Sequence, residues 1–236
     1  MRTRIVLAAA LAAGALALTA APASAATTAD GAAAAPAAKD CGELKLTAAL
    51  PAPPAGMAVQ QQVSVGADCK PVLGEVRLVP AKSGAVEDRS ARSARSVRTA
   101  VEAGTTRQFT SSSEWYDCCN IRMTGLYTTS SWTTDGTRIS AANTDATQQW
   151  NREPWNAGWS LKSATKNTDC TTDCTVSHTQ ADAEFTYKGI FDVTGAWYAN
   201  TMHSYVDLHA DGTATCRFET ETRHTFIGWN WQHSCQ

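Results

Sequence analysis

The chain has 236 residues, with 20 lysines and arginines against 22 aspartates and glutamates, a formal charge of −2 at pH 7. This mildly acidic balance argues against nucleic acid as a partner, because nucleic-acid-binding surfaces concentrate positive charge. The first aromatic residue is Phe109. Since aromatic side chains supply much of the buried area of a core, the residues before Phe109 cannot form a domain equivalent to the rest.

Residues 1–25 have the pattern of a secretory signal peptide. Arg2 and Arg4 precede an apolar run, and Ala23-Ser24-Ala25 forms a small-residue cleavage signal. We therefore expect cleavage after Ala25 and a secreted, extracellular protein of formal charge −4, because two arginines are lost. A membrane anchor is the alternative, but the apolar run is short and has no stop-transfer charges after it. No later run is long enough to span a bilayer, so no membrane partner is expected after cleavage.

The next segments predict a small N-terminal unit. Residues 26–40 are an Ala-rich leader of the kind that stays flexible. Residues 41–80 contain β-like runs at 57–65 and 72–79, and we predict a small accessory β-unit closed by a Cys41–Cys69 disulfide.

Residues 81–108 predict an Arg- and Ser-rich linker or a short helix. Four arginines spaced three apart lie in this aromatic-free stretch. An alternative hypothesis is therefore that residues 26–112 form a pro-region that proteolysis removes.

Residues 109–236 carry all the aromatic residues and repeated strand patterns. Apolar and polar residues alternate over 180–188, which is typical of a strand with one buried face. Several such runs separated by turns predict a mainly β, aromatic-rich, disulfide-bonded domain, an antiparallel β-sandwich or barrel.

Two Asp-Gly pairs predict hairpin turns. At Asp211-Gly212 a three-residue loop, 210–212, separates apolar from polar residues best, with Leu208 opposite Ala214 and Gly212 in the left-handed region. At Asp135-Gly136 we predict a two-residue loop that would place Trp132 opposite Ile139.

Export makes disulfides the first expectation for the eight cysteines. If Cys118 and Cys119 lie on a strand, they point to opposite faces and need different partners. We predict Cys216–Cys235, with Cys118 and Cys119 bonded to Cys170 and Cys174 in an order that the sequence leaves open. The alternatives are a vicinal Cys118–Cys119 bond with Cys170–Cys174 as a local closure, or zinc on these four cysteines. We expect no metal and no cofactor.

A strand over 197–209 places one line of chemically active side chains on a single face. These side chains are weak candidates for catalysis, and an ordinary wet outer face is the simpler interpretation. The line consists of His203, Tyr205, Asp207 and His209.

Five tryptophans are candidate ligand-binding residues. Indole rings flanked by amides and charges suit planar hydroxylated ligands such as sugars, although core tryptophans give the same pattern. They are Trp150, Trp155 and Trp159 in one loop and Trp229 and Trp231 near the C-terminus.

The pieces WYDCCNIRM, YKGIFDVTGAWY and HADGTATC, with the ending GWNWQHSC, resemble uncharacterised secreted proteins of actinobacteria. The resemblance implies no activity, cofactor or site residue. The leading hypothesis is a non-enzymatic secreted domain that binds or coats a polysaccharide or cell-envelope surface. The alternatives are an extracellular hydrolase that uses the face from His203 to His209, and a protein inhibitor or partner-binding domain.

Overall fold

The computed structural model describes residues 39–81, 104–152, 158–189 and 192–236. The predicted signal peptide and most of the leader and linker lie outside these residues. The described residues form twelve strands and no helix, and so no helix with the length and apolar character of a membrane span. The strands are β1 Leu44–Leu50, β2 Met57–Val65, β3 Pro71–Leu73, β4 Arg77–Pro80, β5 Thr105–Tyr116, β6 Arg122–Thr134, β7 Ile139–Trp150, β8 Gly158–Thr168, β9 Val176–Lys188, β10 Ala199–His209, β11 Ala214–Thr222 and β12 Asn230–Cys235.

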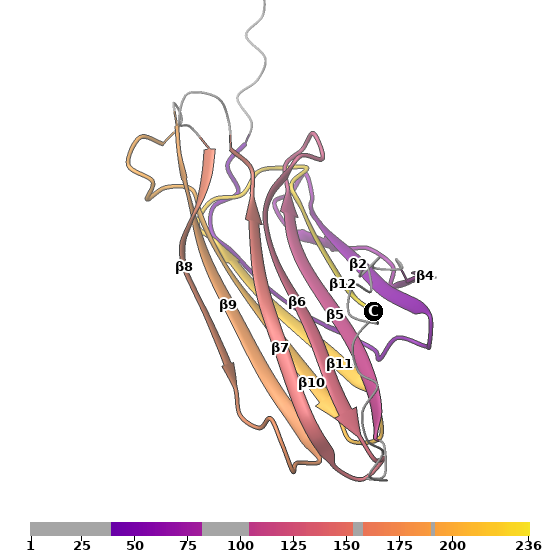
Figure 1. The fold of residues 1–236 in the computed structure, drawn as a ribbon. Coiled ribbons are helices and arrows are strands. Elements are labelled where there is room, and N and C mark those ends of the chain that lie inside the picture. The colour runs from indigo at the N-terminus through magenta and orange to yellow at the C-terminus, as the bar shows by residue number, and fades with distance from the viewer. Residues whose placement is uncertain (1–38, 82–103, 153–157, 190–191) are drawn as a thin grey trace, which may run out of the picture. The chain divides into compact units, whose positions relative to one another are not determined.

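The strands form two antiparallel sheets packed as a sandwich, which confirms the predicted fold class (Figure 1). One sheet has the order β1-β11-β10-β9-β8, and the other has the order β3-β2-β12-β5-β6-β7, with β4 also paired to β2. The predicted alternation in β9 is present, since Ala181, Ala183, Phe185 and Tyr187 are all buried. One face of each sheet is buried against the other sheet, and it carries apolar side chains together with buried serines and threonines.

The core between the sheets contains large aromatic side chains that also make hydrogen bonds. Trp115 of β5 is fully buried, and its indole N–H donates to the Thr220 hydroxyl of β11 across the interface at 2.8 Å. The hydroxyls of Ser111 and Ser204 join the two sheets in the same way at 3.0 Å. These contacts satisfy buried polar groups that would otherwise destabilise the fold.

The predicted division into an accessory unit at 41–80 and a domain at 109–236 is wrong. β1 pairs with β11 at the edge of the five-stranded sheet. β12 pairs with β2 along the whole length of β12. β5 also begins at Thr105, inside the predicted linker. The N-terminal strands join the sandwich because they cover sheet edges whose backbone groups would otherwise stay unpaired.

One predicted hairpin is confirmed and the other is wrong. Leu208 lies opposite Ala214, and Gly212 has φ +87°, as expected of a three-residue loop. The Asp135-Gly136 loop has four residues instead of two, so that Thr134 lies opposite Ile139. The Asp135 carboxylate explains the difference, because it accepts the backbone N–H groups of Thr137 and Arg138 and stabilises the longer turn.

Disulfides join Cys41 to Cys69 and Cys216 to Cys235, as predicted. The bonds predicted from Cys118 and Cys119 to Cys170 and Cys174 are wrong. Cys170 bonds Cys174 within the β8–β9 loop, whereas both thiols of the doublet are free. The doublet lies in the β5–β6 turn and not on a strand, and the strand register places that turn and the β8–β9 loop at opposite ends of the sandwich. This separation also excludes the four-cysteine zinc site.

Candidate functional site

Most aromatic side chains gather at one end of the sandwich, where β7, β9 and β11 end and β8, β10 and β12 begin. We call this end the aromatic end. Its rings form a connected chain with centroid distances of 4.4 to 6.4 Å between neighbours. The members of this aromatic cluster are Trp159, Tyr187, Trp197, Tyr198, Phe226 and Trp229.

Of the five predicted tryptophans, only Trp159 and Trp229 belong to this cluster within the described residues. Trp159 is 7% exposed and contacts Trp229 indirectly, through Tyr187 and Tyr198. Trp231 is fully buried, and its indole N–H donates to Ser113 at 2.9 Å. Trp159 and Trp231 are therefore part of the core.

Trp229 is half-buried within the aromatic cluster, and Trp150 is not a member of it. Trp150 is half-buried against Phe185, with the Arg152 guanidinium 5.6 Å from the centre of its ring. Trp155 lies outside the described residues.

Trp197 is the most exposed member of the aromatic cluster, at 39%. Its ring stacks on the imidazole of His224, with centroids 4.0 Å apart and an angle of 29° between the planes. Tyr198 and Phe226 meet it edgewise. One face of the indole is thus supported from below, which fixes the orientation of the ring at the surface.

A buried carboxylate holds the loop that presents Trp197. Asp192 is 5% exposed and accepts hydrogen bonds from the backbone N–H groups of Thr194, Gly195, Trp197 and Tyr198, and from the Thr194 hydroxyl. Burial opposes ionisation, but these hydrogen bonds outweigh it and hold the pKa of Asp192 well below its usual value. The carboxylate therefore orders the segment from 192 to 198 in a single conformation.

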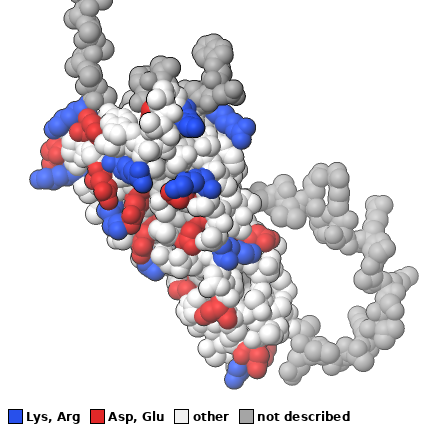
Figure 2. All heavy atoms as spheres, turned by 90° about the vertical axis from the view of Figure 1, so that its left-hand side faces the viewer, with Lys and Arg blue, Asp and Glu red and all other residues white. Residues whose placement is uncertain are grey.

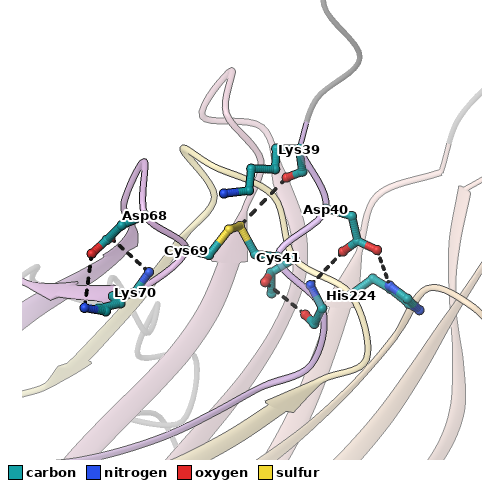
Figure 3. The surroundings of a disulfide bond; sticks show 9 residues. Lys39, Asp40, Cys41, Asp68, Cys69, Lys70 and His224 are labelled. Carbon is teal, nitrogen blue, oxygen red and sulfur yellow. Dashed lines mark hydrogen bonds and ion pairs between the residues drawn. A yellow bond between two sulfur atoms is a disulfide. The ribbon is translucent and has the colours of Figure 1, made fainter.

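The N-terminal segment anchors the other side of the cluster (Figure 3). The Asp40 carboxylate lies 2.7 Å from the His224 ring nitrogen, and the next residue, Cys41, is bonded to Cys69 (Figure 3). The Cys41 N–H also donates to the Thr225 carbonyl at 2.8 Å. Burial works against ionisation of Asp40, but hydrogen bonds from Gly42 and His224 lower its pKa. Residues nearly two hundred positions apart thus fix the platform under Trp197.

Two hollows lie near the aromatic end or lead towards it. The larger, of about 700 Å³, runs over the outer face of β2, β12 and β5 beside β3 and β4, and reaches Tyr116. Amides and hydroxyls line much of it, namely Gln60, Gln62, Gln232, Ser64, Ser112 and Ser234. We call it the amide groove.

The smaller hollow, of about 460 Å³, lies against the loop that presents Trp197. Its charged residues are Lys162, Lys188 and Arg223 against Glu184, which pairs with Lys162 at 2.6 Å. The hollow therefore has an excess of positive charge in an acidic chain.

The predicted catalytic line lies on the outer face of the five-stranded sheet. His203 bonds Asp182 at 2.6 Å, and Asp207 bonds His178 at 2.7 Å. The bond to Asp207 raises the pKa of His178. These side chains are paired with their strand neighbours and line neither of the two hollows.

Tyr205 and His209 complete the line. The Arg217 guanidinium stacks over the Tyr205 ring at 3.7 Å, and the backbone N–H of His209 donates to Thr213 in the hairpin turn. On the side of the molecule that bears β8, acidic and basic side chains are interleaved (Figure 2). The described part of this face carries paired charged side chains, among them Asp182 with His203 and Asp207 with His178.

Within the described residues no three His, Cys, Asp or Glu side chains are placed to hold a metal ion. Comparisons with models of known protein families, with curated proteins and with solved structures found no match. Sequence reasoning missed Tyr198, Phe226 and His224 as members of the site. Their signal was weak, because each contact joins segments far apart in the chain.

Proposed function

We propose that the protein is an exported, non-enzymatic binding domain whose ligand is a polysaccharide or another glycan-bearing envelope surface. The observation that carries this proposal is the exposed indole of Trp197, supported by His224 and surrounded by polar groups. Three disulfides indicate an oxidising environment, which agrees with an extracellular place of action.

The geometry of Trp197 suits a sugar ring. One face of the indole is taken by His224, and its aromatic neighbours meet its edges, so the opposite face can receive the apolar C–H face of a pyranose. An ordered platform also lowers the entropy lost on binding. The hydrogen bonds to Asp192 supply that order.

Polar neighbours supply the second half of a glycan site. The amide groove offers donors and acceptors with few charges, which matches the hydroxyl groups of a neutral sugar chain. The cationic hollow beside residues 194–196 suits a carboxylate or phosphate carried by an acidic envelope polymer. Together they favour an extended, hydroxylated ligand over a small apolar one.

The test is a pull-down of the purified protein on insoluble polysaccharides and on cell-wall preparations. We expect retention by at least one of these and a loss of roughly tenfold in affinity for Trp197→Ala, since aromatic stacking contributes about 1.5 kcal/mol. Leu73→Ala is the matched control, because Leu73 is 70% exposed on β3 and outside the cluster. Trp155→Ala tests the predicted tryptophan loop in the same assay. A protein that binds none of these materials would refute the proposal.

The hydrolase alternative has less support. His203 bonds the Asp182 carboxylate and Asp207 bonds the His178 ring, and both partners lie on β9. The neighbouring Ser204 hydroxyl points into the core, where it bonds Ser111. A nucleophile–base pair facing a hollow is what the chemistry needs. The described residues of this face do not provide one.

A further inference from the structure

The doublet Cys118-Cys119 has no role in the binding surface proposed above, yet its geometry is specific. Both thiols are exposed in the turn between β5 and β6, and their sulfur atoms lie 3.7 Å apart. The other six of the eight cysteines are joined in three disulfides. Within the chain, each thiol of the doublet therefore has only the other as a partner.

The turn holds the two thiols together. The Asp117 carboxylate accepts the backbone N–H groups of Cys119 and Ile121 at 2.9 and 2.8 Å. Asn120 has φ +60°, a left-handed conformation that asparagine tolerates better than most residues. The backbone of the doublet is thus ordered before any bond forms between the sulfur atoms.

A glycine makes room for the doublet on the neighbouring loop. Gly228 has φ +87°, and a Cβ atom added there would lie 3.2 Å from the Cβ of Cys118. The turn therefore contacts the β11–β12 loop, one residue before Trp229 of the aromatic cluster.

We propose that Cys118 and Cys119 form a vicinal disulfide in the exported protein, and that this bond is its reducible thiol–disulfide exchange site. A low-molecular-weight disulfide or an oxidoreductase disulfide is the oxidant. One Cys thiolate attacks it, forms a mixed disulfide and releases one thiol. The second thiolate then attacks the Cys sulfur of the mixed disulfide, closes the ring and releases the second thiol. The doublet loses two electrons and two protons, and the oxidant becomes two thiols.

Sequence adjacency separates this bond from the three others. Adjacent Cα atoms across a trans peptide are about 3.8 Å apart, below the usual range for a disulfide. The three disulfides of the structure have Cα separations of 5.2, 6.5 and 6.4 Å, inside that range. A strained and exposed bond is reduced more readily than structural bonds are. The doublet is therefore expected to open first.

The local charges set the pH at which the pair reacts. The hydrogen bond with Cys118, and then the charges of Cys118 and Asp117, raise the pKa of the Cys119 thiol. Since the thiolate is the attacking species, exchange at this site should accelerate as the pH rises above neutral.

The test uses the full chain exported by a bacterial host and quenched in acid. Free thiols are alkylated without reductant, and the tryptic peptide from Gln108 to Arg122, which contains both cysteines, is weighed. We expect a mass two hydrogens below that of the dithiol, with no alkyl group attached. Two alkyl groups on this peptide, or a link to another molecule, would overturn the vicinal bond.

A titration with dithiothreitol tests the reducibility separately. We expect the doublet to open at a concentration about tenfold lower than the three other bonds, which corresponds to about 30 mV for a two-electron couple. Opening together with the others would overturn this half of the proposal. Cys118→Ser and Cys119→Ser should each leave a thiol that alkylates or forms a mixed disulfide. A single variant without any such reactivity would also contradict the bond. The control, Cys170→Ser with Cys174→Ser, should leave the peptide unchanged.

Discussion

The two ends of the sandwich are closed in different ways. At the end opposite the aromatic cluster, which we call the turn end, three loops each have a local closure, although neighbouring loops also bond one another, as Ile139 and Cys174 do. Asp135 and Asp211 bind the N–H groups of their own turns, and Cys170 bonds a residue four positions away. At the aromatic end, besides local closures such as that of Asp192, one closure joins distant segments, namely the pair formed by Asp40 and His224. Local closures need only the right turn residues, whereas distant ones need the whole fold.

The largest single effect is expected from the removal of a disulfide. Cys41→Ser with Cys69→Ser should lower the free energy of unfolding by about 3.5 kcal/mol, and Cys170→Ser with Cys174→Ser by about 2 kcal/mol. The reason is that the bonds close loops of 28 and 4 residues, so they restrict the unfolded chain to different extents. Urea unfolding under non-reducing conditions measures both values. A larger loss at the turn end would contradict the comparison.

Acid stability should depend on a residue that belongs to neither end. His233 is buried in β12 between Trp231 and Phe218, and burial lowers its pKa to about 4. Because this value is below the usual 6.5, the neutral ring contributes stability that is present above pH 6.5 and lost as the pH falls towards 4. The full loss is about 3 kcal/mol.

His233→Gln should remove this pH dependence without removing the hydrogen-bonding capacity near Gln61. Unfolding midpoints of the variant and the parent at pH 7, 5.5 and 4 give the measurement. If both proteins lose the same stability between pH 7 and 4, the dependence comes from other groups. His178 opposes this pH dependence, because its raised pKa stabilises the folded protein as the pH falls.

Asp192 at the aromatic end and Asp211 at the turn end can be compared directly, because each carboxylate accepts hydrogen bonds from its own loop. Asp192→Ala should cost about 3 kcal/mol and abolish glycan retention, because four N–H groups lose their acceptor and Trp197 loses its fixed position. Asp211→Ala at the turn end should cost about 1 kcal/mol and leave retention unchanged, since only Thr213 depends on it. Thermal unfolding and the pull-down give both values. Unchanged retention for Asp192→Ala would show that the loop held by Asp192 is not needed for binding.

The smallest effects concern two glycines with the same φ of +87°. Gly212→Ala should cost about 1 kcal/mol for the left-handed backbone, because the nearest atoms belong to the flexible end of Arg107. Gly228→Ala should cost about 2 kcal/mol, because the added Cβ also meets the Cβ of Cys118. Thermal unfolding measures the difference. Equal costs would mean that the turn containing Cys118 moves aside without a cost in free energy.

Sequence reasoning succeeded and failed at both ends, depending on whether residue types alone determine the local structure. The Gly212 hairpin was predicted to the residue because alternation and turn chemistry are both local. The doublet was misassigned because strand parity was applied to residues that lie in a turn, where Asp117 determines the conformation. The loop length at Asp135 was wrong for a related reason, since its side chain adds hydrogen bonds that a dipeptide signal does not contain.

The candidate site was predictable only in its composition. The abundance of tryptophan with polar neighbours suggested the glycan hypothesis, but it did not indicate which indole is exposed. Trp159 and Trp231 are buried because they lie on the inner faces of β8 and β12, while Trp197 follows a loop that Asp192 folds outward. The placement of the N-terminal strands could not be predicted either, because their partners are β11 and β12.

The position of β12 has a consequence for the order in which the molecule assembles. This strand is the last of the twelve described strands in chain order, yet it lies inside the seven-stranded sheet, between β2 and β5. β2 therefore has to wait for a partner that is synthesised some 170 residues later. Such a long separation slows folding and delays closure of the sheet until β12 is available.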